Sequence, residues 1–525
     1  MRQYQNPLIQ VLKYINLNNM FDISKIFSFL KKTFSRKDIL LIVLLIGLYF
    51  LTRLINLDKF PIFSDEGIYI RWAKVAWHDA SWRFISMTDG KQPLQTWGTI
   101  PFLKLFPDNA LLAGRLFAVT TGFVALIGTF SILFFLFGKT SALIGSFLYI
   151  ITPFFLFFDR ISLVDSGVNA GFVWILLLTI VLAKYRKLET ALILGFMGGF
   201  FLLAKSSVRI FFMLGVFTPL LFLEKDWKKL FKNALNYYLL FGLSLIIALV
   251  IYNVQRLSPF FQFVDKKNLS FVMGFDEFLK TPFKVFFDNV GLTPLYIWWE
   301  SGFVMPLLAI PGLILLFKRD KKLAGYLFIW FLLPFVAIVF FTKVLFPRYM
   351  IFFGSLFLIL ATYFLINISK KLRIFFITLI IIAVSYFNYT IIFDYKNIPF
   401  PAVDRGQYIE GWPAGWGIKE FMDYARVKSQ TKPVVILAEG NFGMAGDVLD
   451  VFLKRSDKIT IKSYWPLGEE QLRENLSLLK DNIVYVFFSH QEEFPENWPI
   501  SLKPFQIITK PGNKSTFRIF ELVSD

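Results

Sequence analysis

Two acidic residues, Asp65 and Glu66, follow the first long apolar stretch of the chain in the segment FPIFSDEGIYIRWAKVAWHDAS. On the outer face of a membrane enzyme, a carboxylate in this place can take the proton from an acceptor hydroxyl. The same pair also fits the first turn of a helix, with the hydroxyl of Ser64 as the cap and the acids at the positive end of the helix dipole. The local pattern leaves both interpretations open, and other segments must decide between them.

Basic residues elsewhere in the chain have the chemistry of a phosphate site, because Lys and Arg stabilise developing phosphate charge. They are predicted at the outer ends of membrane spans or in outer loops: Lys91, Lys205, Arg209, Lys343 and Arg348. Each one alone also fits a side chain that reaches up to lipid phosphates. Cations on this side run against the usual charge bias of membrane proteins, so the group as a whole is a candidate site.

A second acidic position is predicted near the start of a later span. Asp165, with Asp159 as the alternative, is a candidate to bind the acceptor or to help hold a metal, although both also fit a simple acid at a span end. Two or three carboxylates are enough to bind a divalent ion through oxygen. The sequence requires no cofactor, so a divalent cation stays an open expectation.

The composition indicates the elements that must position these residues. Of the 525 residues, 56% are hydrophobic, and 66 Phe and 13 Trp raise the aromatic share to 19%. Apolar runs of span length, separated by short charged clusters, indicate a polytopic helical membrane protein. The net charge of +19 lies mainly in short loops, which argues for membrane topology and against nucleic acid. The absence of Cys excludes disulfides and thiolate metal sites, and two His residues argue against a multi-histidine site.

The apolar runs predict eleven spans, at residues 39–57, 111–136, 140–157, 165–183, 190–204, 208–223, 234–254, 301–317, 323–342, 349–366 and 373–393. With the N-terminus inside, Lys and Arg concentrate in the predicted inner loops and are sparse in the short outer ones. We therefore expect a multi-pass protein of the plasma or inner membrane, with a cytoplasmic N-terminus and an extracytoplasmic C-terminus.

The remaining segments divide the chain further. Residues 1–38 are basic and mildly amphipathic, which predicts a segment on the cytoplasmic membrane surface. The transmembrane domain covers 39–393 and carries two large outer loops, 58–110 and 255–300. The tail, 394–525, is predicted to be a small extracytoplasmic α/β domain. Its strands are expected at 434–439, 459–465, 483–490, 505–510 and 516–522, with helical stretches near 416–427, 444–455 and 469–480.

The segment DGKQPLQTW places Lys91 close before Pro93 and resembles the Lys-Pro-Pro-Leu segment of lipid-dependent glycosyltransferases. Other matches keep the order of that superfamily: the acidic pair after the first span, Ala113, Gly114 and Arg115 at the second, Arg160 and Asp165 before the fourth, Lys205 at the end of the fifth, and Lys343, Arg348 and Tyr349 before a late span. The resemblance, over about residues 40–370, is to membrane enzymes of the C-type (GT-C) fold, which include protein O-mannosyltransferases and the aminoarabinose transferases of lipid A.

The resemblance implies a GT-C-like fold of a bacterial or archaeal branch and a polyprenyl-phosphate sugar donor. It implies a donor phosphate site made by Lys91, Lys205, Arg209, Lys343, Arg348 and Tyr349. We expect Asp65 to be the general base of a single, inverting displacement. Adjacent helix residues point about 100° apart, so Glu66 is expected to orient a cation, the acceptor or Asp65 itself.

Two departures from the family pattern concern the turn and the tail. Gln92 stands where the family often has the first Pro of its pair, which we expect to alter only the turn. The α/β tail differs from the β-trefoil of eukaryotic protein mannosyltransferases, which argues against protein substrates. Within the tail, Trp412 and Trp416 could stack on a sugar, but anchoring the domain at the membrane is the simpler expectation. Gly440, Gly443 and Gly446 are expected to form a turn, and His490 to be structural.

Two other functions stay open. A transporter or flippase of a lipid-linked glycan would also place polar groups near the membrane, but such proteins usually show internal repeats and midplane charges. A ligase that moves whole lipid-linked oligosaccharides shares the logic of the fold. A glycan, a lipid or a protein each remains a possible acceptor.

Overall fold

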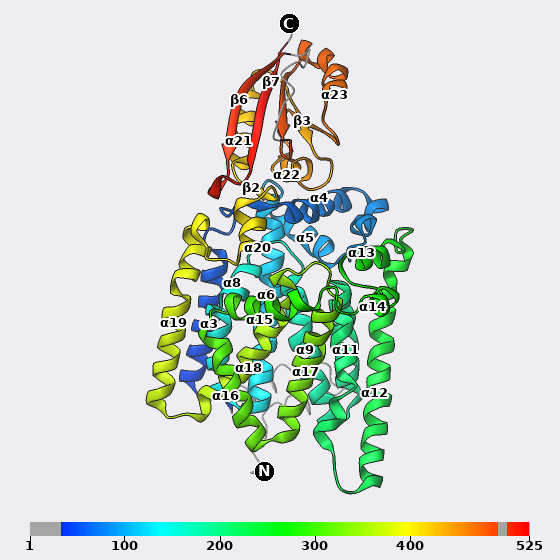
Figure 1. Ribbon diagram of the computed structural model, residues 1–525, viewed down its shortest axis with the longest axis vertical. Helices are drawn as coiled ribbons and strands as arrows, with labels where there is room; N and C mark the ends of the chain where they lie inside the picture. Colours follow the sequence, from blue (N-terminus) through cyan, green and yellow to red (C-terminus); the bar gives the residue numbers. More distant parts are fainter. Residues whose placement is uncertain (1–32, 492–500, 524–525) are drawn as a thin grey trace.

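The computed structural model describes residues 33–491 and 501–523, so the predicted surface segment 1–38 lies almost wholly outside the described residues. Figure 1 shows a tall bundle of helices with a small sheet domain at one end, formed by the C-terminal part of the chain. The protein is therefore a multi-pass helical membrane protein with a small C-terminal α/β domain, as the sequence predicts.

The bundle contains helices near every predicted span. Its members are α3 (Arg36–Leu54), α6 (Ala110–Phe137), α7 (Lys139–Ile151), α8 (Pro153–Phe158), α9 (Asp165–Tyr185), α10 (Leu188–Leu202), α11 (Arg209–Gly215), α12 (Trp227–Asn253), α15 (Phe286–Glu300), α16 (Val304–Arg319), α17 (Lys321–Phe341), α18 (Ile351–Asn367) and α19 (Lys370–Phe393). Among the described residues, six helices are long and apolar enough to cross a membrane, or seven if a bent pair is one span. The predicted count of eleven is therefore not confirmed.

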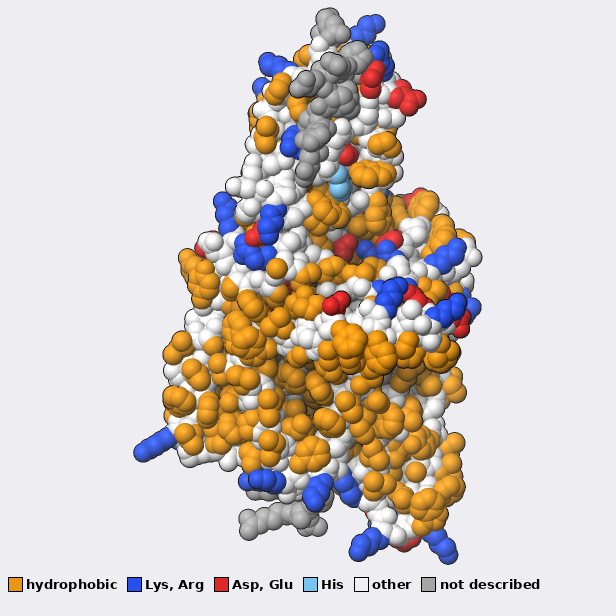
Figure 2. Space-filling view, viewed as in Figure 1, with side chains coloured by type: hydrophobic (Ala, Val, Ile, Leu, Met, Phe, Trp, Pro, Cys, Tyr) orange, Lys and Arg blue, Asp and Glu red, His pale blue; other side chains and the backbone are white. Residues whose placement is uncertain are grey.

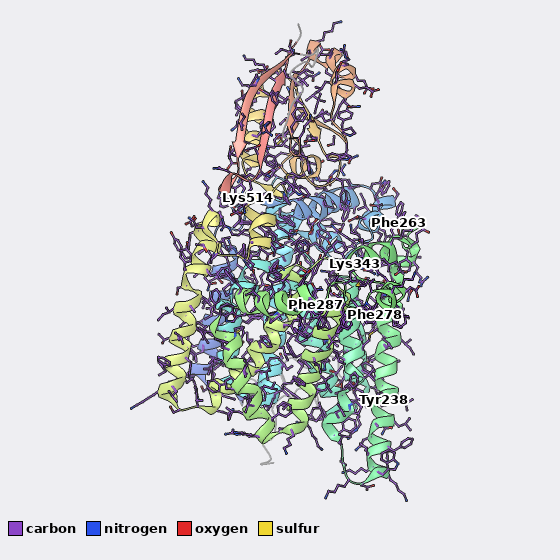
Figure 3. All side chains as sticks on the ribbon, viewed as in Figure 1. Tyr238, Phe263, Phe278, Phe287, Lys343 and Lys514 are labelled. Atoms are coloured by element: carbon purple, nitrogen blue, oxygen red, sulfur yellow. The ribbon has the colours of Figure 1, made fainter. Side chains whose placement is uncertain are left out.

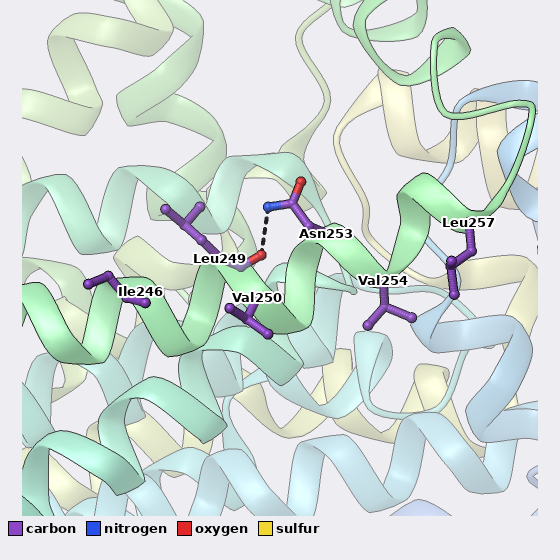
Figure 4. A pocket seen from close by; sticks show the side chains of 6 residues that line it. All are labelled: Ile246, Leu249, Val250, Asn253, Val254 and Leu257. Carbon is purple, nitrogen blue, oxygen red and sulfur yellow. Dashed lines mark hydrogen bonds between the residues drawn. The ribbon is translucent and has the colours of Figure 1, made fainter.

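Burial orders the helices from the middle of the bundle outward. In the apolar window of α9, 94% of the residues are buried, against 22% for α12 and 28% for α19. The side chains of α9 therefore form the interior, and those of α12 and α19 face the lipid. Figure 2 shows a broad apolar band across the visible face of the bundle, with Lys and Arg side chains along its lower rim. A shallow groove on α12 and η5 (Val254–Leu257), shown in Figure 4, is lined by five apolar side chains and Asn253, and thus carries no ionisable group.

The first predicted outer loop folds into short elements across the end of the bundle. They are β1 (Ile62–Phe63), α4 (Ser64–His78), η1 (Ala80–Trp82), η2 (Ile85–Asp89) and α5 (Leu94–Leu105). Helix α4 lies across the bundle rather than along it (Figure 1). It buries Ile68, Trp72 and Ala76.

The second predicted outer loop, 255–300, is largely helical. It contains α13 (Phe263–Phe271), α14 (Phe275–Lys280) and the whole of α15, which meets α16 at an angle of 107°. The pair α15 and α16 is thus a broken span or a re-entrant segment. The predicted span at 301–317 corresponds only to α16, the second half of this pair. Gly302 and Phe303 separate it from α15, with positive φ angles of 78° and 60°.

The C-terminal domain has a five-stranded mixed sheet in the order β4-β3-β5-β7-β6. The strands are β3 (Val434–Glu439), β4 (Ile459–Tyr464), β5 (Ile483–Phe488), β6 (Leu502–Thr509) and β7 (Thr516–Leu522), and they confirm the five predicted strands within a few residues. Strands β4, β3 and β5 are parallel, while β5–β7 and β7–β6 are antiparallel. Helices α21 (Ile418–Lys428), α22 (Gly446–Val451) and α23 (Glu469–Glu474) accompany the sheet.

Three contacts fasten this domain to α4. Strand β2 (Ala414–Gly415) pairs antiparallel with β1. Arg71 of α4 forms a 3.0 Å ion pair with Asp447 of α22. The turn before α22 also approaches α4 closely at Gly443, which has a φ of +77°. A Cβ at this position would lie only 2.5 Å from the Ser64 hydroxyl. The predicted turn around Gly440 and Gly443 is confirmed, and both glycines adopt the left-handed conformation that side chains disfavour.

Candidate active site

Asp65 lies between two cations that come from distant parts of the chain. Its carboxylate is 3.2 Å from Arg348 Nη2 and 3.5 Å from Lys91 Nζ. Burial alone would raise the pKa of Asp65, but the charges of Lys91, Arg348 and Lys267 outweigh it and leave the pKa below its usual value. Asp65 is therefore an ionised carboxylate, and 28% of its side chain remains exposed.

A second pair lies beside the first. Lys205 Nζ is 3.5 Å from Asp165 Oδ1 and 4.0 Å from the ring centre of Tyr349. Tyr349 follows Arg348 in η6 (Pro347–Met350), so one turn of helix contributes to both pairs. Burial lowers the pKa of Lys205, and the neighbouring Asp165 opposes that shift.

The turn at Lys91 is tied to the segment of Lys205. The Gln92 amide donates to the Ser206 hydroxyl at 2.6 Å, and the Leu94 N–H donates to the Leu203 carbonyl at 2.9 Å. Gln92 thus does more than alter a turn, since its side chain joins the first outer segment to the end of α10. These bonds explain why Lys91 and Lys205, 114 positions apart along the sequence, lie at one site.

Two residues that the sequence analysis did not select complete the group. Lys267 of α13 pairs with Asp89 of η2 at 2.7 Å, and Lys91 Nζ is 3.5 Å from the other oxygen of Asp89. We call the combined set the polar cluster: Asp65, Asp89, Asp165, Lys91, Lys205, Lys267 and Arg348. Four cations face three carboxylates in it, so an added anion finds an excess of positive charge.

Glu66 points away from the polar cluster and is fully buried. Its two carboxylate oxygens each accept a 2.8 Å hydrogen bond from the guanidinium of Arg115, which is buried as well. The Ser162 N–H donates to the same carboxylate at 2.7 Å, and the Phe63 N–H donates to it at 3.0 Å. Glu66 therefore holds the first turn of α4 against Arg115 and Ser162, and it supports Asp65 by keeping this helix start in place.

The helix start itself differs from the prediction. Helix α4 begins at Ser64, and its N-cap is Phe63, so the expected cap by the Ser64 hydroxyl is wrong. The Ser64 N–H donates instead to the Pro413 carbonyl at 2.9 Å, and the Glu66 carboxylate takes over the capping role on the Phe63 N–H. A distant segment thus satisfies one of the N–H groups at the helix start that have no partner within the helix.

Three predicted site residues lie in other ion pairs or hydrogen bonds. Lys343, near the upper ends of the helices in Figure 3, pairs with Glu277 at 2.6 Å. Arg209 donates to the Tyr252 hydroxyl and lies over that ring. Asp159 is fully buried and pairs with Arg53 at 3.2 Å. Within the described residues, none of these three side chains forms an ion pair with a member of the polar cluster.

A buried acidic pair also lies near Arg348. Glu300, the last residue of α15, and Asp404 of α20 (Ala402–Arg405) are fully buried. None of their four carboxylate oxygens has a hydrogen-bond partner among the described residues. Burial raises the pKa of Asp404 to about 7, and the charge of Arg348 only partly opposes this shift. The sequence offered no signal for this pair, because 104 positions separate its members.

No group of three or more His, Cys, Asp or Glu side chains able to hold a metal ion occurs in residues 33–491 and 501–523. The carboxylates of the polar cluster are instead held apart by cations, with Lys91 between Asp65 and Asp89. The described residues therefore offer a site for an anion rather than a ready cage for a cation.

The comparisons with known proteins concern the family and the fold. Residues 91–252 match the family described as dolichyl-phosphate-mannose-protein mannosyltransferase. No curated protein matches the chain in sequence. Among solved structures, the apo form of ArnT from Cupriavidus metallidurans is similar with a TM-score of 0.59 and 14% identity, over 92% of this chain and 97% of ArnT.

Two further structures show the same fold with lipid phosphates bound to them. ArnT bound to undecaprenyl phosphate gives a TM-score of 0.59 at 14% identity, over 93% of this chain and 98% of that one. The oligosaccharyltransferase AglB from Archaeoglobus fulgidus, in complex with an inhibitory peptide and a dolichol-phosphate, gives a TM-score of 0.51 at 13% identity. This match covers 87% of this chain and 70% of AglB. The chain therefore has the GT-C fold, and the family resemblance drawn from the sequence is confirmed.

Proposed function

We propose that the protein is a membrane glycosyltransferase that moves a sugar from a polyprenyl-phosphate donor to an acceptor hydroxyl. The observation that carries this proposal is the polar cluster, where an ionised carboxylate lies within 3.5 Å of two cations at the end of a GT-C bundle. The mannosyltransferase family match over residues 91–252 and the lipid phosphates bound to ArnT and AglB support the donor class.

The donor phosphate binds to the cations of the polar cluster. Arg348 offers a planar fork of donors, and Lys91 and Lys205 offer point charges on either side of it. The Lys205 ammonium also lies over the face of the Tyr349 ring, in a cation–π contact. Lys343 and Arg209 take no part in this proposal, because each is held by a partner outside the cluster. The cations stabilise the negative charge that grows on the phosphate as it leaves.

Asp65 acts as the general base. In the free protein Arg348 and Lys91 keep its pKa low, which would make it a weak base. A bound donor phosphate shares these two cations, so their hold on Asp65 weakens and its proton affinity rises. The acceptor oxygen then loses its proton to Asp65 while it attacks the anomeric carbon from the face opposite the phosphate. One displacement of this kind inverts the anomeric configuration.

The proposed topology places this chemistry on the outer face of the plasma or inner membrane. The polar cluster lies at the end of the bundle that carries the C-terminal domain, and the Lys and Arg side chains of the lower rim mark the opposite end (Figure 2). The positive rim is expected on the cytoplasmic side. The donor is then used on the side where the C-terminal domain lies.

The test incubates purified protein with a panel of polyprenyl-phosphate hexoses and pentoses, together with glycan, lipid and peptide acceptors, and measures free polyprenyl phosphate. We expect release with at least one donor and a loss of about 100-fold or more in Asp65→Asn, the usual range for removing a general base. Asp58→Asn is the matched control, because Asp58 has nearly the same exposed fraction, 27%, but pairs with Lys419. Release that continues undiminished in Asp65→Asn would refute the base assignment.

Two other outcomes separate the competing functions. If no donor is cleaved and the protein moves glycolipids across liposomes, it is a transporter or flippase. If only lipid-linked oligosaccharides are cleaved, it is a ligase that transfers whole glycans.

A further inference from the structure

The carboxyl ends of three parallel strands meet at one edge of the C-terminal sheet. Strands β4, β3 and β5 end at Tyr464, Glu439 and Phe488, and the register pairs Glu439 with Tyr464 across β3 and β4. In open α/β sheets, ligands bind in the crevice at this edge, because the loops that leave the strands there diverge. Nothing in the proposed chemistry so far uses this edge.

Three aromatic side chains gather at that edge, and we call them the aromatic platform: Trp412, Trp465 and His490. Trp465 directly follows β4, His490 follows β5 by two residues, and Trp412 comes from the segment before β2. The His490 ring centre is 4.8 Å from that of Trp412 and 5.2 Å from that of Trp465. Both indole side chains remain open to solvent, with exposed fractions of 48% and 60%. Large apolar rings that stay exposed in this way are uncommon away from binding surfaces.

Hydrogen bonds hold the platform rigid. The Glu439 carboxylate accepts from the N–H groups of Ser489, His490 and Gln491 at 2.7 to 3.1 Å, which fixes the turn that carries the imidazole. The Ser489 hydroxyl lies 2.8 Å from His490 Nδ1. On the other side, the Lys510 ammonium donates to the Trp412 carbonyl at 2.9 Å. A rigid ring loses little entropy when a ligand stacks on it.

The platform borders the proposed active site through the backbone. Trp412 precedes Pro413, whose carbonyl accepts from the Ser64 N–H, and Asp65 is the next residue. From the turn after β3, Phe442 contacts Trp72 of α4 with ring centres 6.0 Å apart, and the Lys91 ammonium is 5.6 Å from the same indole. Figure 2 shows a hollow below the C-terminal domain, with acidic and basic side chains inside it. The platform and the start of α4 are thus joined by a backbone hydrogen bond one residue from Trp412 and one residue from Asp65.

We propose that the aromatic platform binds a sugar ring of the acceptor, so that the acceptor is a carbohydrate chain. This inference rests on the proposed glycosyltransferase function and names its acceptor class. The C–H faces of a pyranose pack on exposed indole rings, while its hydroxyls need a polar partner, which the His490 imidazole supplies. The sequence analysis expected Trp412 to anchor the domain and His490 to be structural, but their stacking at a solvent-open sheet edge favours a ligand.

The binding test uses full-length protein in nanodiscs and needs no donor. Saturation-transfer NMR is recorded with mannotriose, maltotriose and chitotriose as probes, and with a peptide rich in Ser and Thr. We expect transfer to at least one trisaccharide. The affinity for that trisaccharide, from a titration of the transfer signal, should fall at least fivefold in Trp465→Ala, about a 1.0 kcal/mol change, and should recover in Trp465→Phe. Trp82→Ala is the matched control, because Trp82 is 40% exposed but stacks on Phe260.

Three outcomes overturn the inference. They are no transfer to any trisaccharide, transfer that is equal in wild type and Trp465→Ala, and transfer to the peptide in place of the sugars. The release of polyprenyl phosphate is measured on the same samples. Wild-type protein that binds a trisaccharide but cleaves no donor refutes the glycosyltransferase proposal alone, whereas donor cleavage without trisaccharide binding refutes the platform alone.

Discussion

Replacing Glu66 by Gln should destabilise the protein without removing its chemistry. Glu66 accepts four hydrogen bonds, two of them from the buried Arg115 guanidinium. Gln keeps the shape but removes the charge and turns one of the two acceptor oxygens into a donor, so the buried Arg115 guanidinium loses its counter-charge and keeps one amide oxygen and the backbone carbonyls of Leu57, Phe60 and Pro61. Breaking a buried pair from one side costs about 3–5 kcal/mol.

This free energy converts into a measurable shift of the melting temperature. At about 2.1 cal/mol/K per residue, unfolding of 525 residues carries an entropy of roughly 1.1 kcal/mol/K. The melting temperature of Glu66→Gln should therefore lie roughly 3–5 °C below that of the wild type. The intrinsic fluorescence of the 13 Trp residues reports it in detergent. Glu277→Gln is the control, since its ion pairs are partly exposed and worth at most about 1 kcal/mol.

A double-mutant cycle with Arg115→Gln completes the argument. Once Glu66 is neutral, removing the Arg115 charge costs less than it does in the wild type, so the double variant should be more stable than the sum of the single changes by about 2–3 kcal/mol. At 20 °C we expect Glu66→Gln to release polyprenyl phosphate within tenfold of wild type. A normal melting temperature combined with the activity loss expected for Asp65→Asn would refute this reasoning and assign Glu66 to the chemistry.

The remaining predictions concern the phosphate site, the domain contact and the buried acid pair. Arg348→Gln should raise the KM for the donor about tenfold or more, because a charged hydrogen-bonding group is worth about 1.5–3 kcal/mol, and steady-state release of polyprenyl phosphate measures it. Gly67→Val should weaken the contact between α4 and the C-terminal domain, since a Cβ at Gly67 would lie 2.6 Å from a methyl group of Val448. Limited trypsin digestion should then cut the chain between the bundle and the domain faster. The pKa of Asp404 is raised to about 7 from 3.8, so the folded protein holds a proton that the unfolded chain loses, and stability falls as the pH rises from about 4 to about 7. Asp404→Asn should remove up to about 4 kcal/mol of this decline, seen as a flatter melting temperature against pH.

Each of these predictions has a control and a contradicting result. Lys343→Gln should leave the donor KM unchanged, and an equal rise in both variants would place the phosphate elsewhere. Gly47→Val should not speed digestion, because a Cβ there meets nothing within 4 Å. Parallel pH curves for wild type and Asp404→Asn would show that this carboxyl titrates normally.

Local patterns predicted the elements of this protein well where each element carries its own signal. The strand at Val434–Glu439 is a run of apolar and β-branched residues, and it occurs at the predicted residues. The number of spans was harder, because α7, α10 and α11 are shorter than a bilayer and α15 bends sharply into α16. Hydropathy measures the apolar length of a segment and carries no information about a bend.

The candidate site was predicted in part, since its residue types are distinctive while their partners are not. Asp65, Lys91, Lys205 and Arg348 were all selected from the sequence and lie together, although their catalytic and binding roles stay predictions. The pairing of Lys343 with Glu277 was not foreseeable, because the local sequence around Lys343 is mostly apolar and does not identify a partner in a distant segment. Cross-chain bonds also displaced the expected helix cap: the Pro413 carbonyl reaches Ser64 across about 350 residues of sequence.

The bond between Ser64 and Pro413, together with the β1–β2 ladder, has a consequence for the order of biosynthesis. Residues 414 and 415 leave the ribosome about 350 positions after the helix start that they hold. A nascent chain therefore cannot complete the bonds at the start of α4 until about four-fifths of it has been made and residues 413–415 have reached the same side of the membrane as α4. Chains that end before residue 413 thus lack the bonds that hold the start of the helix on which Asp65 lies.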